Sequence, residues 1–269
     1  MNNFFTRTIT ALFFAIACVA CIYFNGYIHL LFFIFSIIGF NEYLRINGPK
    51  KRKALSRLYL LYAILMSGSF ALMQMNIIPE KMIWANVFLL ASIFVIELYQ
   101  RDHFPFDQIA KLIVGYVYVI VPFALYTALG YIVSGEYNFE IPLGFLILVW
   151  ANDSGAYVFG VTLGKNRLFE RISPKKSWEG FFGGMIIAGI SAYIISQYFQ
   201  SISLQHWVVI SIIIVVFGTL GDLIESMLKR SKEIKDSGSI LPGHGGVLDR
   251  FDALLIAAPM VYAYLHLFL

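Results

Sequence analysis

The chain has 269 residues, of which 59% are hydrophobic and only 13% are charged, with a formal net charge of +4. Soluble domains carry about twice this charged fraction, and apolar stretches near 20 residues recur along the whole chain. These features exclude a soluble globular protein. They predict an all-α polytopic membrane protein embedded in a lipid bilayer.

Apolar stretches predict nine membrane-spanning helices. In chain order they cover residues 8–24, 27–40, 58–78, 82–98, 109–133, 141–159, 181–199, 207–228 and 251–269. The first could pass for a signal peptide, but further spans follow at once, which favours an uncleaved helix. The second is short, so we expect a tilted hairpin with the first. We divide the chain into a five-span scaffold, residues 1–135, and a four-span catalytic region, residues 136–269.

The positions of the basic residues predict the orientation. If the N-terminus is cytoplasmic, all of the 20 lysines and arginines except Lys81 fall on the cytoplasmic side. This asymmetry is what the positive-inside rule requires, and nine spans then place the C-terminus outside. The basic run at residues 45–57 could suggest nucleic-acid binding, but setting topology and contacting anionic headgroups is favoured. We therefore expect a multi-pass protein of the cell (inner or plasma) membrane, without a nucleic-acid partner.

Polar residues gather after the sixth predicted span. Asp153 lies near the end of that span, and Lys175 and Lys176 directly precede the seventh. A carboxylate and two lysines at the cytoplasmic interface suggest a phosphate site. Gly180 and Gly184 form a GxxxG pattern, which is more often a sign of close helix packing than of chemistry.

The eighth span ends in ionisable residues on one helical face. Asp222, Glu225, Ser226 and Lys229 are spaced i, i+3, i+4 and i+7. Charged groups at the mouth of an apolar helix are costly unless they bind something, so they are a functional hypothesis. The structural alternative is a buried ion pair between Lys229 and either Asp222 or Glu225.

The chain between the last two spans contains Gly243, His244, Gly245 and Gly246. Glycines leading into a helix N-terminus can present backbone N–H groups to phosphate. The alternative is a tight turn that uses glycine and is stabilised by the histidine.

The ninth span begins with Asp249 and Asp252, which share a face in the first turn. Helix capping explains one of them. It does not explain Asp222, which arrives at the same side of the membrane from the neighbouring span. Clustered carboxylates without thiolate or imidazole partners suit a hard divalent cation, Mg²⁺ above all. A metal and lysines at headgroup depth indicate phosphoryl or nucleotidyl transfer to a lipid.

Residues 226–252 also resemble a known signature. They match the pattern of the phosphatidate cytidylyltransferase (CDP-diacylglycerol synthase) family without a departure. The segments around Asp153 and Lys175 are similar to secondary motifs of that family, with Ser177 where Thr is expected. The resemblance is firm for the C-terminal half, whereas the N-terminal half matches in hydropathy and length alone.

This resemblance implies a reaction in which CTP and phosphatidic acid give CDP-diacylglycerol and pyrophosphate with Mg²⁺. It leaves open whether a second cation binds and whether the enzyme is a homodimer. The expected metal ligands are Asp222 and Asp249, with Asp252, Asp236 and Asp153 as further candidates. The residues expected to neutralise or bind phosphates are Lys229, Lys235, Arg250, Arg230, Lys175, Lys176, Ser226, His244, Gly245 and Gly246.

Two other functions compete with this interpretation. A CTP-dependent polyprenol kinase would share the carboxylates and lysines, but it would need help in deprotonating an alcohol. A transporter would place its charges near the midplane between two related halves, and here they gather at one face. The motif of a CDP-alcohol phosphotransferase is absent from the sequence.

Overall fold

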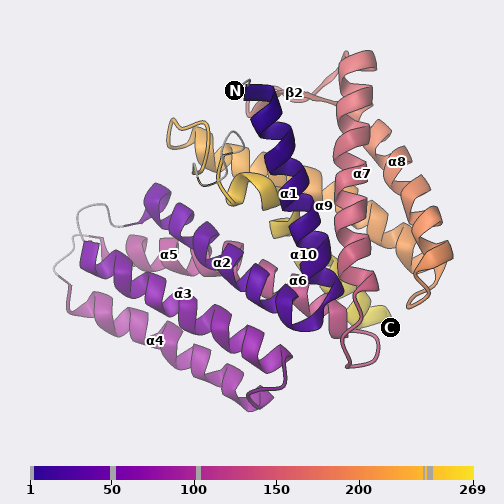
Figure 1. The fold of residues 1–269 in the computed structure, drawn as a ribbon. Helices are drawn as coiled ribbons and strands as arrows, with labels where there is room; N and C mark the ends of the chain where they lie inside the picture. Colours follow the sequence, from indigo (N-terminus) through magenta and orange to yellow (C-terminus); the bar gives the residue numbers. More distant parts are fainter. Residues whose placement is uncertain (1–2, 49–52, 101–103, 239, 241–244) are drawn as a thin grey trace.

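The computed structural model describes residues 3–48, 53–100, 104–238, 240 and 245–269. In the first two of these segments, side chains are described from residues 12 and 55 onward. It is almost entirely helical (Figure 1). The α-helices are α1 (Asn3–Tyr23), α2 (Asn25–Asn47), α3 (Lys53–Gln74), α4 (Ala85–Leu98), α5 (Pro105–Gly115), α6 (Val121–Ala128), α7 (Glu140–Leu163), α8 (Trp178–Tyr198), α9 (Leu204–Arg230) and α10 (Leu248–Phe268). The shorter elements are η1 (Glu80–Trp84), the π-helical turn η2 (Tyr116–Ile120), η3 (Leu129–Tyr131), and strands β1 (Arg167–Phe169) and β2 (Ser173–Ser177).

The predicted membrane-spanning architecture is confirmed. Within the described residues, eight helices are long and apolar enough to cross a membrane, and α1 adds a shorter apolar segment over Leu12–Tyr23. Large apolar side chains such as Phe88 and Leu98 are about three-quarters exposed, at 77% and 76%. Outward apolar side chains on hydrogen-bonded helices are what a bilayer requires. The chain is a multi-pass membrane protein.

The two ends of the helix bundle carry different parts of the chain. The start of α1 lies at the same end as β2, whereas the end of α10 lies at the opposite one (Figure 1). The strand β2 and the N-terminal end of α1 therefore share one side.

Helix α2 is longer than the sequence predicted. It runs for 23 residues to Asn47 instead of ending near Phe40, so the expected short second span is wrong. The prediction ended the span early because the charged residues Glu42 and Arg45 lower the mean hydropathy of the segment that follows Phe40. The helix continues because Glu42 is buried and accepts hydrogen bonds from another part of the chain.

The segment between α7 and α8 forms a β-hairpin that the sequence analysis did not predict. Strands β1 and β2 are antiparallel, with Arg167 opposite Ser177 and Phe169 opposite Ser173. The Ser177 side chain then accepts a hydrogen bond from the Gly180 amide at 3.2 Å and caps α8. The hairpin thus delivers β2 directly into the start of α8.

Glycines allow the C-terminal helices to approach closely. A Cβ at Gly180 would lie 2.8 Å from the Ala156 carbonyl oxygen, and one at Gly184 would lie 3.0 Å from that of Asn152. The predicted packing role of this GxxxG pair is confirmed for α7 against α8. At Gly221 a Cβ would overlap the Asp252 carbonyl oxygen, so α9 and α10 are also in close backbone contact.

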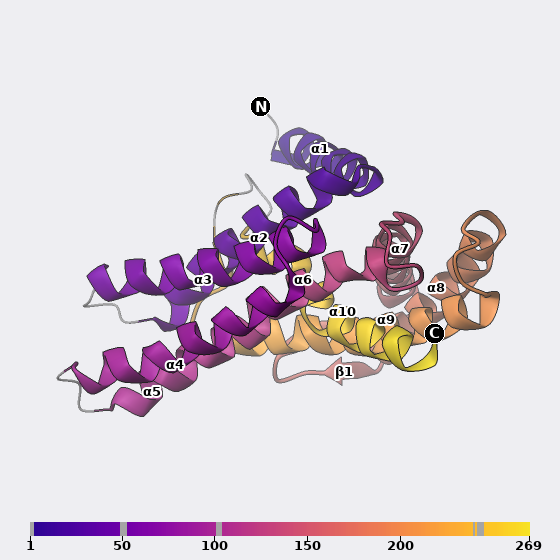
Figure 2. The same cartoon turned by 90° about the horizontal axis from the view of Figure 1, so that it is seen from below.

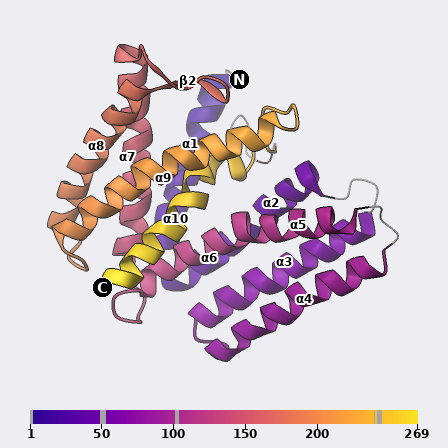
Figure 3. The same ribbon diagram turned by 180° about the vertical axis from the view of Figure 1, so that it is seen from behind.

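The two predicted regions share one apolar core. In Figures 2 and 3, α7 and α8 lie on one side and α3 and α4 on the other, with α9 and α10 between them. The Phe251 ring of α10 packs against Phe35, Phe123 and Phe32 at centroid distances of 5.0, 5.3 and 5.8 Å. The boundary predicted at residue 135 falls in the turn between η3 and α7.

Candidate active site

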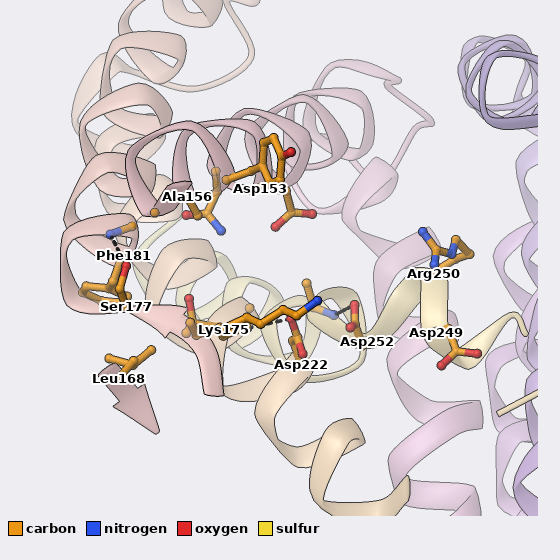
Figure 4. A pocket seen from close by; sticks show the side chains of 18 residues that line it. Asp153, Ala156, Leu168, Lys175, Ser177, Phe181, Asp222, Asp249, Arg250 and Asp252 are labelled. Atoms are coloured by element: carbon orange, nitrogen blue, oxygen red, sulfur yellow. Dashed lines mark hydrogen bonds and ion pairs between the residues drawn. The ribbon is translucent and has the colours of Figure 1, made fainter. Parts of the chain in front are cut away.

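A cavity of about 480 Å³ lies between α7, β2, α8, α9 and α10. Seven charged residues contribute to its lining: Asp153, Lys175, Lys176, Asp222, Asp249, Arg250 and Asp252. All seven were predicted as site residues from the sequence. Figure 4 shows that Asp153, Asp222 and Asp252 face the same space from different helices.

Asp222 and Lys176 form the central ion pair of this cavity. The Lys176 Nζ lies 2.6 Å from the Asp222 Oδ2, and both side chains are partly exposed, at 25% and 37%. The hydroxyl of Ser226, one turn along α9, donates a hydrogen bond to Asp222 Oδ1 at 3.2 Å. Strand β2 therefore supplies the cation that neutralises the α9 carboxylate.

Asp252 reaches the cavity because of the glycines on α9. A Cβ at Gly218 would lie 3.4 Å from the Ala253 Cβ, and one at Gly221 would overlap the Asp252 carbonyl. This close approach brings the first turn of α10 against α9 beside Asp222. Asp153 completes the set from α7, so three carboxylates from three helices line one cavity.

Asp249 has a different environment from the other three carboxylates. It accepts hydrogen bonds from Lys229 Nζ at 2.7 Å, Ser237 N at 2.9 Å and Gly246 N at 2.8 Å, and its side chain is only 6% exposed. Figure 4 shows it lying apart from Asp153 and Asp222. Both of its oxygens accept hydrogen bonds from the protein, and its expected role as a metal ligand stays a prediction.

Lys229 is enclosed by carboxylates. Besides Asp249, it forms an ion pair with Glu225, whose side chain is 1% exposed. The structural alternative in the sequence analysis, a buried pair of Lys229 with Glu225, is therefore present. Lys229 does not pair with Asp222, which is held by Lys176 instead.

The amides at the start of α10 bind carboxylates of the protein. Gly246 N donates to Asp249, while Val247 N and Leu248 N each donate at 3.0 Å to Glu42. Gly245 adopts a φ of +81°, a conformation that favours glycine. The phosphate-binding role expected of Gly245 and Gly246 stays a prediction, and the Gly246 amide is already engaged.

The other predicted residues lie away from the cavity lining. Arg230, Lys235 and Asp236 are exposed, and Arg230 donates a long hydrogen bond of 3.4 Å to the Ile234 carbonyl. His244 falls outside the described residues.

Glu42 was not predicted as a site residue; it lies on α2 in the N-terminal half and is 1% exposed. A signal was present, since a carboxylate within an apolar stretch is rare and marks a functional or structural site. Its partners could not be inferred, because they lie about 200 residues along the chain.

These features define a class of protein: an integral membrane protein with a cavity that is lined by carboxylates, two lysines and an arginine. The chain matches the Cytidylyltransferase family over residues 5–268 and belongs to that family.

The relatives of this chain extend over nearly its whole length. It is 34% identical over 242 residues to the phosphatidate cytidylyltransferase of Bacillus subtilis, covering 89% of this chain and 88% of the relative. It is 35% identical over 261 residues to that of Staphylococcus epidermidis, covering 95% of this chain and 96% of the relative. The phosphatidate cytidylyltransferase of Staphylococcus aureus is 34% identical with the same coverage.

Proposed function

We propose that the cavity lined by Asp153, Lys176, Asp222 and Asp252 is the site of cytidylyl transfer from CTP to phosphatidic acid. The family match and the full-length relatives assign this chain phosphatidate cytidylyltransferase activity, with CDP-diacylglycerol and pyrophosphate as products. The observation that carries the assignment to this cavity is the ion pair of Lys176 with Asp222 beside two further carboxylates.

Asp222 and Asp252 are our candidates for holding Mg²⁺, with Asp153 as a third carboxylate of the same cavity. Among the described residues, no three His, Cys, Asp or Glu side chains form a ready-made metal cage. Mg²⁺ usually binds one or two carboxylates together with water and substrate phosphates, and Asp222 and Asp252 offer two carboxylates from neighbouring helices. When bound, the ion would neutralise and orient the triphosphate of CTP. Asp249 fits this role less well because Lys229, Ser237 and Gly246 engage its oxygens.

The cations of the cavity would bind the phosphates. Lys176, which pairs with Asp222, would instead form an ion pair with a phosphate oxygen when the substrate binds. Lys175 and Arg250 line the same cavity. An oxygen of the phosphatidic acid phosphate attacks the α-phosphorus of CTP, a new P–O bond forms, and the bond to the departing pyrophosphate breaks. The attacking oxygen is already ionised, so positioning and charge neutralisation supply the catalysis and no strong general base is needed.

A smaller pocket adjoins the proposed site. It has a volume of about 40 Å³, and it shares Asp153 and Asp252 with the larger cavity. Phe14, Leu146 and Trp150 contribute apolar side chains to its lining, so apolar groups lie next to the carboxylates, as an acceptor that joins a lipid chain to a phosphate requires. We further propose that the cavity opens toward the cytoplasm, since Lys175 and Lys176 belong to the lysine-rich side of the chain.

Lys229 would support the site indirectly, by holding Glu225 and Asp249 in place. Its ion pairs with Glu225 and Asp249 join the end of α9 to the start of α10. We therefore assign it a bracing role in place of the phosphate contact suggested by the family resemblance.

The test is turnover by detergent-purified protein given phosphatidic acid, labelled CTP and Mg²⁺. A parallel sample contains EDTA, and another contains a polyprenol in place of phosphatidic acid. Labelled CDP-diacylglycerol and pyrophosphate that appear only with metal and phosphatidic acid support the proposal. Phosphorylated alcohol and CDP would replace it with the lipid-kinase function.

A further inference from the structure

The first turn of α10 is capped from the other half of the protein. Glu42 on α2 accepts hydrogen bonds from Val247 N through Oε1 and from Leu248 N through Oε2, each at 3.0 Å. The residue at the cap position itself, Val247, has an apolar side chain and cannot accept these bonds. The acceptor lies 205 residues earlier in the sequence than Val247.

The chain around Glu42 is shaped to admit its carboxylate. A Cβ at Gly238 would overlap Glu42 Oε1 and lie 2.8 Å from its Cδ, and the three nearest atoms all belong to Glu42. The hydroxyl of Ser237 lies 3.2 Å from Glu42 Oε2 and 2.9 Å from Asp249 Oδ2, so it can donate to either carboxylate. Glu42 thus contacts both the loop before α10 and the network that holds Asp249.

Residues of the proposed active site follow the capped amides directly. Arg250 and Asp252 lie two and four residues after Leu248, within the first five residues of α10. A rotation or shift of this segment would displace both side chains relative to Asp222. Because a buried carboxylate is strongly unfavourable without partners, its hydrogen bonds hold the turn in one place.

We propose that Glu42 is a positioning residue for the transfer reaction, which acts by fixing the start of α10 so that Arg250 and Asp252 line the same cavity as Asp222. The N-terminal half then contributes to the chemistry and is more than a scaffold. This inference rests on the proposed function of the cavity.

The first test compares Glu42→Gln with Glu97→Gln. Glu97 is the matched control because it is also a buried carboxylate of the N-terminal half, 1% exposed, and it accepts a hydrogen bond from Tyr59 on α3. In Glu42→Gln, an NH₂ group replaces one of the two carboxylate oxygens, so one of the two backbone amides loses its acceptor. For this variant we expect kcat to fall about tenfold or more, with KM for CTP and phosphatidic acid within about threefold of wild type. For Glu97→Gln we expect kcat near that of wild type.

Thermal stability in detergent is measured for both variants. If kcat falls in both in proportion to lost stability, or if Glu42→Gln turns over like wild type, the positioning role is wrong. If the wild type itself makes no CDP-diacylglycerol, the proposed function fails instead, and the two failures are distinct.

A double-mutant cycle tests the contact itself. Gly238→Ala should reduce kcat in the wild type, because the new methyl group overlaps Glu42. In a Glu42→Ala background the same substitution should have little further effect, since the removed carboxylate leaves room for the methyl group. If the fold-loss in kcat of the double variant equals the product of the losses in the two single variants, Gly238 and Glu42 act independently, which would contradict the proposed coupling.

Discussion

Lys176 on strand β2 and Asp222 on helix α9 are joined by a 2.6 Å ion pair at the centre of the cavity. This pair links the hairpin to the helix that carries the carboxylate. It also gives Asp222 a counter-ion that a bound cation could replace, while Lys176 turns to a phosphate.

Asp222→Asn should lower kcat by about a hundredfold or more, because it removes the charge proposed to hold the metal at the developing transition state. The measurement is initial rate of CDP-diacylglycerol formation at saturating CTP and Mg²⁺. Asp107→Asn is the control, since Asp107 is an exposed carboxylate at the start of α5, outside the cavity lining. Equal rates for the two variants would rule out Asp222 as a metal ligand.

Lys176→Gln should raise KM for CTP and lower kcat, since a neutral amide neither pairs with Asp222 nor neutralises a phosphate. We expect a combined loss in kcat/KM of about a hundredfold, the size of losing one charged contact in the transition state. Steady-state kinetics with varied CTP measure both constants. Lys165→Gln removes an exposed lysine outside the cavity lining and should leave them unchanged; a similar loss there would indicate a general effect of surface charge.

Lys229→Met should destabilise the protein by about 3 kcal/mol or more, because it leaves Glu225 and Asp249 buried without their cation. The midpoint of thermal unfolding in detergent reports this change. Arg230→Met, at the adjacent exposed position, should shift the midpoint little. An unchanged midpoint for Lys229→Met would show that the ion pairs do not brace α9 and α10.

Gly221→Ala should reduce both stability and turnover, because its methyl group would overlap the Asp252 carbonyl and separate α9 from α10. Gly189→Ala on α8 is the control. A Cβ there has no heavy atom within 4 Å, so the substitution should be neutral or stabilise the helix by up to about 1 kcal/mol. Thermal unfolding and turnover of both variants make the comparison, and tolerance of alanine at residue 221 would contradict the close packing.

Chelation by EDTA should abolish turnover, and added Mg²⁺ should restore it without refolding. Far-ultraviolet circular dichroism should stay unchanged throughout, since the helices are held by packing and hydrogen bonds of the chain. Asp252→Asn should need a higher Mg²⁺ concentration for half-maximal rate if Asp252 helps to hold the ion. Turnover that persists in EDTA would contradict the proposed Mg²⁺ dependence of the reaction.

The membrane-spanning architecture and the polar residues of the proposed site could both be predicted from the order of residues in the chain. Hydropathy over about 20 residues is a property of a contiguous segment, so the spans could be located without knowing their neighbours. The residue types around Asp222 and Asp252 likewise indicated phosphate chemistry through their order in the chain. Seven predicted charged residues, including Lys176 and Arg250, do line one cavity.

Which of these residues line the cavity and which pair with each other depends on how the helices pack, and this could not be predicted from the chain order. Asp249 and Asp252 are three residues apart, yet the first is held by Lys229 while the second lines the space beside Asp222. Their roles depend on the rotation of α10 against α9, which is set by close packing at Gly221. The partners of Glu42 lie about 200 residues further along the chain, and no local pattern in the sequence encodes a contact over that separation.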